Sequence, residues 1–197
     1  ASQRKINKRR KQTPPRRDVA ALILRKTKAL LRDCDAETRN SLARVAPYAD
    51  TLTARAANTP QLSDGCVDLV VTSPPFLDVV DYAKDNWLRS WVCGIDPGSV
   101  EFTTPKSVDE WRGAMTAVFH ELARVLRPGG HVAFEVGEVR GGKCRLDEHV
   151  VPCGAAAGLE PLLILVNAHA FTKTANCWGI TNGASGTNTN RVVLFRK

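Results

Sequence analysis

Apolar residues along this chain recur at two spacings, one typical of amphipathic helices and one typical of buried strands. Asp18 is suited to cap a helix that continues through Leu24 to Leu31, and a second helix is expected over 35–47. The remaining predicted helices span 81–93, 107–126 and 146–157, and the predicted strands span 51–57, 67–71, 131–136, 162–166 and 191–195. This alternation of strands and helices favours an α/β fold.

The order of these elements predicts a mostly parallel sheet covered by helices on both faces. The short last strand is expected to return antiparallel beside its predecessor. A complete doubly wound sheet needs further strands before Thr51, where the sequence offers only helices and a basic tail. The first strands of such a sheet are therefore expected to be missing from this chain.

The length of 197 residues, 43% of them hydrophobic, is enough for one domain with a proper core. The composition divides the chain into a basic tail (1–17), a helical segment (18–50) and a sheet-forming domain (51–197). No apolar stretch approaches the roughly 18 residues that a membrane-spanning helix needs. The sequence thus predicts neither a membrane segment nor a membrane partner.

The six cysteines are scattered without a Cys-x-x-Cys pair, and the four histidines share no metal-binding spacing. This pattern is typical of reduced thiols in the cytoplasm rather than of a disulfide framework or a zinc site. We therefore expect a cytoplasmic protein without a bound metal.

The net charge of +8 is concentrated at one end of the chain. The first 17 residues hold eight basic side chains and no acidic one, so the remainder is neutral. Such a block is either a solvated, disordered arm or an arm that binds nucleic-acid phosphates, and charge alone does not distinguish DNA from RNA. The candidate phosphate contacts are Arg9, Arg10, Lys11, Arg16 and Arg17.

A stiff loop follows the predicted strand 67–71, at the carboxyl edge where open α/β sheets bind their ligands. It reads Thr72-Ser73-Pro74-Pro75-Phe76. The prolines fix the backbone and donate no N–H group, so neighbouring carbonyls can accept hydrogen bonds from an amino group. The serine hydroxyl can accept another, and the phenylalanine ring can stack on a flat base. The loop therefore suggests methylation of an amine.

The segment Asp-Leu-Val-Val-Thr-Ser-Pro-Pro-Phe (68–76) resembles the DNA amino-methyltransferases, whose catalytic motif is Ser/Asn/Asp-Pro-Pro-Tyr/Phe. Ser73-Pro74-Pro75-Phe76 matches this motif residue for residue. In that family the serine version is associated mainly with cytosine-N4 methylation, whereas Asn or Asp leans toward adenine-N6. Further similar segments, within a resemblance that covers roughly 50–197, are 77–82, 86–89, 122–130, 134–140 and 186–191.

The resemblance implies a Rossmann-like methyltransferase sheet, S-adenosyl-L-methionine as cofactor, and DNA as partner, as in restriction-modification. It assigns the catalytic loop to Ser73, Pro74, Pro75 and Phe76. It also points to substrate contacts by Thr72, Asp81, Tyr82 and Trp178. The other tryptophans (87, 91 and 111) are expected to be core anchors.

The chain departs from this family on the cofactor side. The family's Phe-x-Gly-x-Gly loop is absent, no Gly-x-Gly occurs anywhere, and Ala57-Asn58 stands where many relatives have Asp. The cofactor-binding residues are therefore unassigned, and a missing preceding segment or a second chain is expected to supply them, unless this copy is degenerate. Two alternatives follow: an RNA base amino-methyltransferase, and a non-catalytic, half-site nucleic-acid-binding subunit.

Overall fold

The computed structural model describes residues 3–13, 16–75, 77, 81–100, 103, 105–139, 143–168 and 189–197. They form two compact units, residues 1–51 and residues 52–197. No helix in these ranges is long and apolar enough to cross a membrane.

The first unit consists of short helices: α1 (Gln3–Arg9), α2 (Val19–Leu30), α3 (Ala36–Val45) and the 3₁₀ turn η1 (Ala46–Tyr48). Asp18 caps α2 as predicted, because its Oδ1 accepts a hydrogen bond from the amide of Ala21 at 3.1 Å. Asp35 caps α3 in the same way, accepting from Thr38 at 2.7 Å. Part of the basic tail is thus helical, while α2 and α3 bury none of their residues.

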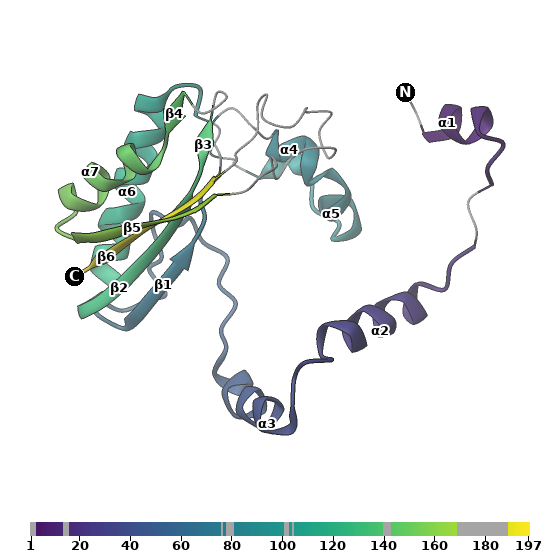
Figure 1. The fold of residues 1–197 in the computed structure, drawn as a ribbon, viewed down its shortest axis with the longest axis horizontal. Coiled ribbons are helices and arrows are strands. Elements are labelled where there is room, and N and C mark those ends of the chain that lie inside the picture. Colours follow the sequence, from purple (N-terminus) through teal and green to yellow (C-terminus); the bar gives the residue numbers. More distant parts are fainter. Residues whose placement is uncertain are drawn as a thin grey trace. The chain divides into compact units, whose positions relative to one another are not determined.

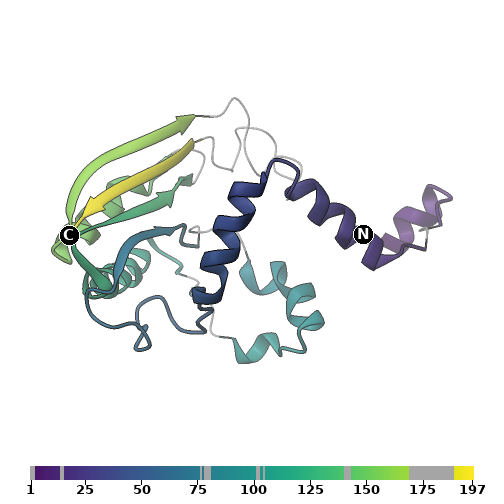
Figure 2. The ribbon, with the colours of Figure 1, turned by 90° about the horizontal axis from the view of Figure 1, so that it is seen from below.

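The second unit contains a four-stranded sheet, in the order β1-β2-β6-β5. Its strands are β1 (Val67–Thr72), β2 (Leu126–Val136), β5 (Glu160–Ala168) and β6 (Thr189–Arg196). β1 and β2 are parallel, and β6 is antiparallel to both β2 and β5. Figure 2 shows this order across the sheet, from β5 in green through β6 in yellow to β2 and β1. The antiparallel last strand is confirmed, but it lies between β2 and β5, so the sheet is mixed.

Helices connect the strands. They are α4 (Tyr82–Asp85), α5 (Trp87–Val92), η2 (Pro97–Ser99), α6 (Val108–Val125) and α7 (Asp147–Ala156), with a small hairpin of β3 (Glu138–Val139) and β4 (Cys144–Arg145). Ser107 caps α6 by accepting from the Glu110 amide at 3.1 Å. The helix predicted over 81–93 is divided into α4 and α5. The strand predicted over 51–57 does not form. Instead, Arg55 closes a tight turn with Asn58, and the bridge between them is an isolated one outside the named strands.

Aromatic residues form the centre of the core, where α6 and α7 pack on one face of the sheet (Figure 1). Phe119 of α6 lies 4.7 Å from Phe134 of β2 and 5.1 Å from Phe195 of β6, measured between ring centroids. All three rings are at most 1% exposed, and burying each contributes about 1.5–3 kcal/mol. These contacts fix the sheet and α6 relative to each other.

The opposite face of the sheet is uncovered within the described residues, contrary to the sequence expectation. Apolar side chains of the outer strands, among them Leu69, Val71, Leu163 and Leu165, are 47–74% exposed. The strand order explains the difference. From β1 to β2 to β5 the chain moves across the sheet in one direction, so right-handed crossovers place α6 and α7 on the same face.

Candidate active site

A cavity of about 430 Å³ opens beside the Pro-Pro loop, at the carboxyl end of β1. This volume lies within the range of small-molecule sites. Several parts of the second unit line it. They are the loop residues Thr72–Pro75, the segment Ala54–Ala57 before β1, the α6 residues Ala114, Met115, Ala117 and Val118, and the single residues Phe134 and Thr103. The structure therefore brings the predicted catalytic residues Ser73, Pro74 and Pro75, and the predicted contact Thr72, to one cavity.

The Pro-Pro loop is anchored by a side chain that no sequence pattern singled out. The indole Nε1 of Trp111 donates a hydrogen bond to the Pro75 carbonyl oxygen at 3.3 Å, and the Trp111 side chain is 1% exposed. The carbonyl of Pro75 is thus already an acceptor within the protein. The carbonyls of Ser73 and Pro74 and the Ser73 hydroxyl remain as candidate acceptors for a substrate amine.

Small side chains make up much of the cavity lining, and the segment Ala54–Ala57 forms one wall of the cavity. Five alanines line the cavity: Ala54, Ala56, Ala57, Ala114 and Ala117. Their methyl groups suit a flat apolar ring, whereas a ribose hydroxyl would need a polar partner. Ala57 itself lines the cavity, so the position where many relatives have Asp offers no carboxylate here. Among the described residues, the lining holds polar side chains on Arg55, Thr72, Ser73 and Thr103, but no carboxylate.

A cluster of charged side chains binds Thr59, which follows this wall in the sequence. Glu121 Oε1 accepts hydrogen bonds from the amide and the hydroxyl of Thr59, at 2.6 and 2.5 Å. Arg124 donates to Glu121, to the carbonyls of Thr59 and Leu62, and to Asp64, at 2.6–3.0 Å. Hydrogen bonds from Arg124 and then Thr59 lower the pKa of Glu121 to about 2, so its carboxylate is charged at neutral pH.

Other predicted site residues lie elsewhere or cannot be placed. Asp81 caps α4, accepting from the amide of Lys84 at 3.1 Å and from its Nζ at 2.6 Å, and these side-chain and backbone bonds lower its pKa. Neither Asp81 nor Tyr82 lines the cavity in the described part of the second unit. Phe76 and Trp178 fall outside the described residues, so their predicted roles stay predictions.

The tryptophans divide into two groups. Trp111 is a core anchor, as expected, but Trp87 and Trp91 are 60% and 74% exposed. The expectation was wrong for these two because α5 is a helix of only six residues that buries Ser90 rather than its indoles. Spacing in the sequence could not separate a buried indole from an exposed one.

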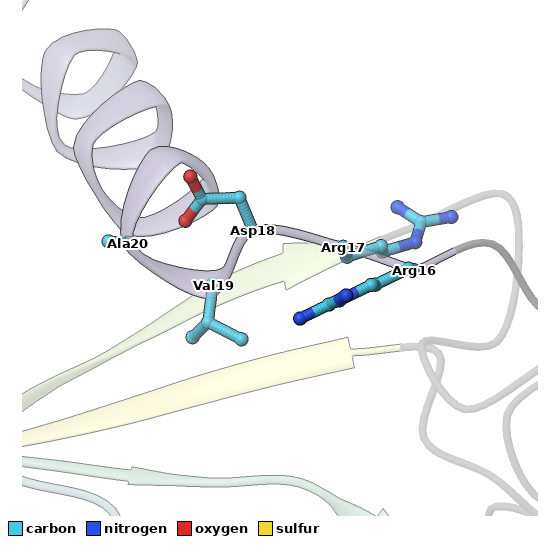
Figure 3. Close-up of a pocket in the computed structure, with 5 residues that line it drawn as sticks. All are labelled: Arg16, Arg17, Asp18, Val19 and Ala20. Carbon is cyan, nitrogen blue, oxygen red and sulfur yellow. The ribbon is translucent and has the colours of Figure 1, made fainter.

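The basic residues of the first unit whose burial the structure describes are exposed, as a phosphate-binding arm requires. They include Arg9, Arg10, Lys11, Arg16 and Arg17. Arg16 and Arg17 border a shallow hollow with Asp18, Val19 and Ala20, and Figure 3 shows their side chains extending from the segment just before α2. Residues 1–51 hold 14 Lys and Arg against 5 Asp and Glu, whereas residues 52–197 hold 14 against 15. The excess positive charge therefore belongs to the first unit as a whole.

No known family model matches this chain, and no curated protein sequence matches it. Among solved structures it is similar to S-adenosylmethionine-dependent methyltransferases. A protein of Thermus thermophilus, provisionally described as a DNA modification methylase and solved with S-adenosyl-L-methionine, matches with a TM-score of 0.41 and 20% identity over 69% of this chain and 47% of its own. A methyltransferase of Methanosarcina mazei matches with a TM-score of 0.41 and 13% identity, over 84% of this chain and 79% of that one.

A 16S rRNA adenine-N1 methyltransferase of Catenulisporales acidiphilia matches with a TM-score of 0.37 and 13% identity, over 73% of this chain and 58% of that one. This chain thus spans about half the length of the Thermus protein. All these TM-scores lie below 0.5, so the likeness carries no argument about function. The function is therefore argued from the residues of this chain.

Proposed function

We propose that this chain provides the substrate side of an S-adenosylmethionine-dependent DNA amino-methyltransferase, with cytosine-N4 favoured over adenine-N6. The observation that carries this proposal is the Ser73-Pro74-Pro75 loop, which follows β1 and borders an alanine-lined cavity of about 430 Å³. Ser73, rather than Asn or Asp, favours cytosine, on the resemblance described above.

The loop suits an exocyclic amine because such a nitrogen has two hydrogens and a lone pair that is delocalised into the ring. We infer that the Ser73 hydroxyl accepts one hydrogen and the Pro74 carbonyl the other. This pair of acceptors favours a tetrahedral nitrogen, whose lone pair becomes available for attack on a methyl group. Transfer would break the bond between that methyl group and the donor sulfur, and the nitrogen would then lose one of its protons to solvent. The rate gain comes from positioning and from fixed dipoles, with no covalent intermediate on the protein.

The cofactor side does not fit the described residues. S-adenosyl-L-methionine would supply the methyl group, but the described residues of the cavity lining include no carboxylate for its ribose, and the sequence has no Gly-x-Gly loop. We propose that a second chain, or a part of the protein beyond this sequence, holds the cofactor. This same observation favours the second candidate, a half-site nucleic-acid-binding subunit.

A base in a duplex would have to leave the helix to reach the loop, at a cost of a few kcal/mol. The proposed stacking of Phe76 on the base would recover about 1–3 kcal/mol of this. The exposed basic residues of the first unit would bind backbone phosphates, independently of sequence. Binding to the phosphates would keep the duplex bound to this chain while the base leaves the stack.

The test is transfer of tritiated methyl groups from S-adenosylmethionine to duplex DNA and to RNA, using the chain alone and with any chain that co-purifies with it. We expect incorporation into DNA at the N4 atom of cytosine. Ser73→Ala should reduce transfer at least tenfold and leave DNA binding unchanged, whereas Ser41→Ala on α3 should change neither. Incorporation into RNA alone would favour the RNA alternative. DNA binding without any transfer would favour the half-site subunit.

A further inference from the structure

Helix α6 contacts both walls of the cavity, at points ten residues apart. Near its first turn Trp111 donates to Pro75 of the loop, and near its last turn Glu121 and Arg124 bind the segment before β1. Ten helical residues span roughly 15 Å. The helix can therefore act as a rigid spacer between the two walls.

The segment before β1 is bound to α6 through Thr59. The turn that carries Ala54–Ala57 is closed by the bond from the Asn58 amide to the Arg55 carbonyl, at 2.9 Å. The next residue is Thr59, whose amide and hydroxyl donate to Glu121 and whose carbonyl accepts from Arg124. All three polar groups of Thr59 are thus bound to one pair of side chains on α6.

The pair is itself well shielded. The Glu121 side chain is 11% exposed and that of Arg124 is 32% exposed. Arg124 also binds the Leu62 carbonyl and Asp64, and its own carbonyl accepts from the Gly65 amide at 3.0 Å, just before β1 begins. Four residues between the cavity wall and the strand, Thr59, Leu62, Asp64 and Gly65, are therefore tied to this turn of α6.

We propose that Glu121 and Arg124 are positioning residues, which hold the wall Ala54–Ala57 at the distance from the Pro-Pro loop that a flat base requires. The role in catalysis rests on the proposed function, but the positioning of the wall does not. Neither residue touches the reacting atoms. Their effect passes through Thr59 to the alanines, and so to the orientation of whatever the cavity holds.

The experiment compares Glu121→Ala and Glu121→Gln with His120→Ala, a matched control because His120 is the exposed neighbour of Glu121 on α6. The first readout is amide hydrogen exchange at Asn58 and Thr59, followed by NMR at a pH where the chain is folded. We expect Glu121→Ala to raise exchange at both amides at least tenfold, with no change along β2. Glu121→Gln should restore part of the protection because its amide oxygen still accepts from Thr59. His120→Ala should have no effect.

The second readout is methyl transfer with duplex DNA. A displaced wall should raise KM for DNA or lower kcat at least fivefold in Glu121→Ala, with recovery in Glu121→Gln. Unchanged amide exchange at Asn58 and Thr59 in Glu121→Ala would overturn the positioning role. Raised exchange with unchanged KM and kcat would overturn the importance of the positioned wall for catalysis. If the wild-type chain transfers no methyl group, either alone or with any chain that co-purifies with it, the proposed function fails, and the exchange data alone then support or overturn the positioning of the wall.

Discussion

Gly154 of α7 lies so close to Phe195 that even one added methyl group should destabilise the second unit. A Cβ atom at this position would lie 2.3, 2.6 and 2.9 Å from three carbons of the Phe195 ring. Non-bonded carbons prefer separations of about 3.5–4.0 Å, so in Gly154→Ala the ring or the helix must move by roughly 1 Å. The ring is fully buried and packs against Phe119, which leaves it no open space.

Two effects of Gly154→Ala oppose each other. Alanine is favoured over glycine within a helix by about 1 kcal/mol, and this would stabilise the variant. Overpacking a core typically costs about 1–3 kcal/mol, and the short distances to a buried ring place this site at the upper end. We expect a net loss of about 2 kcal/mol, which changes the folding equilibrium roughly 30-fold.

Gly113 of α6 provides the matched control, because it is exposed and a Cβ added there meets no atom within 4 Å. The same substitution should therefore stabilise the protein by about 0.5–1 kcal/mol. Urea unfolding followed by tryptophan fluorescence suits the comparison, since all four tryptophans lie in the second unit.

The decisive measurement is the coupling free energy between the substitution at Gly154 and a substitution of Phe195. In the double variant Gly154→Ala/Phe195→Leu, the smaller side chain should relieve the clash, and a coupling free energy of about 0.5–3 kcal/mol is expected. The packing argument would be refuted if Gly154→Ala proved as stable as the wild type while Gly113→Ala was stabilised. Additive effects of the two changes would also count against it.

Three other predictions concern the site and the arm. Trp111→Phe removes the hydrogen bond to Pro75, which is worth about 0.5–1.5 kcal/mol. It should slow methyl transfer more than Trp87→Phe, which changes an exposed indole, and equal rates in the two variants would refute the anchoring role. The pKa of Glu121 falls from 4.5 to about 2 on folding, so the charged carboxylate stabilises the folded state fully above about pH 4.5, and this contribution is lost toward pH 2. In an acid-unfolding curve, Glu121→Gln should lack this loss of stability. Replacing both Arg16 and Arg17 by Ala should reduce the slope of log K for DNA against log salt by about 1.8, as measured by fluorescence anisotropy, if both bind phosphates.

Local sequence patterns predicted the elements of this fold well, because capping and periodicity act over a few residues. Asp18 and Ser107 begin helices where expected, and the four sheet strands lie where apolar runs occur. The position of β6 between β2 and β5 could not be predicted, since a strand pattern does not specify its neighbours. The uncovered face follows from the progression β1 to β2 to β5 in one direction across the sheet, through the handedness of the crossovers, and was also missed.

The candidate site shows the same division between local and long-range information. The Pro-Pro loop could be found from five consecutive residues, but its anchor Trp111 is 36 positions away from Pro75, and Glu121 is 62 positions away from Thr59. These contacts change the chemistry that the loop can perform. In the proposed function, with the Pro75 carbonyl held by an indole, the two hydrogens of an amine are left to the Ser73 hydroxyl and the Pro74 carbonyl. An acceptor pair fixed in this way before substrate binds needs little reorganisation during the reaction, which is the condition under which fixed dipoles lower a barrier most.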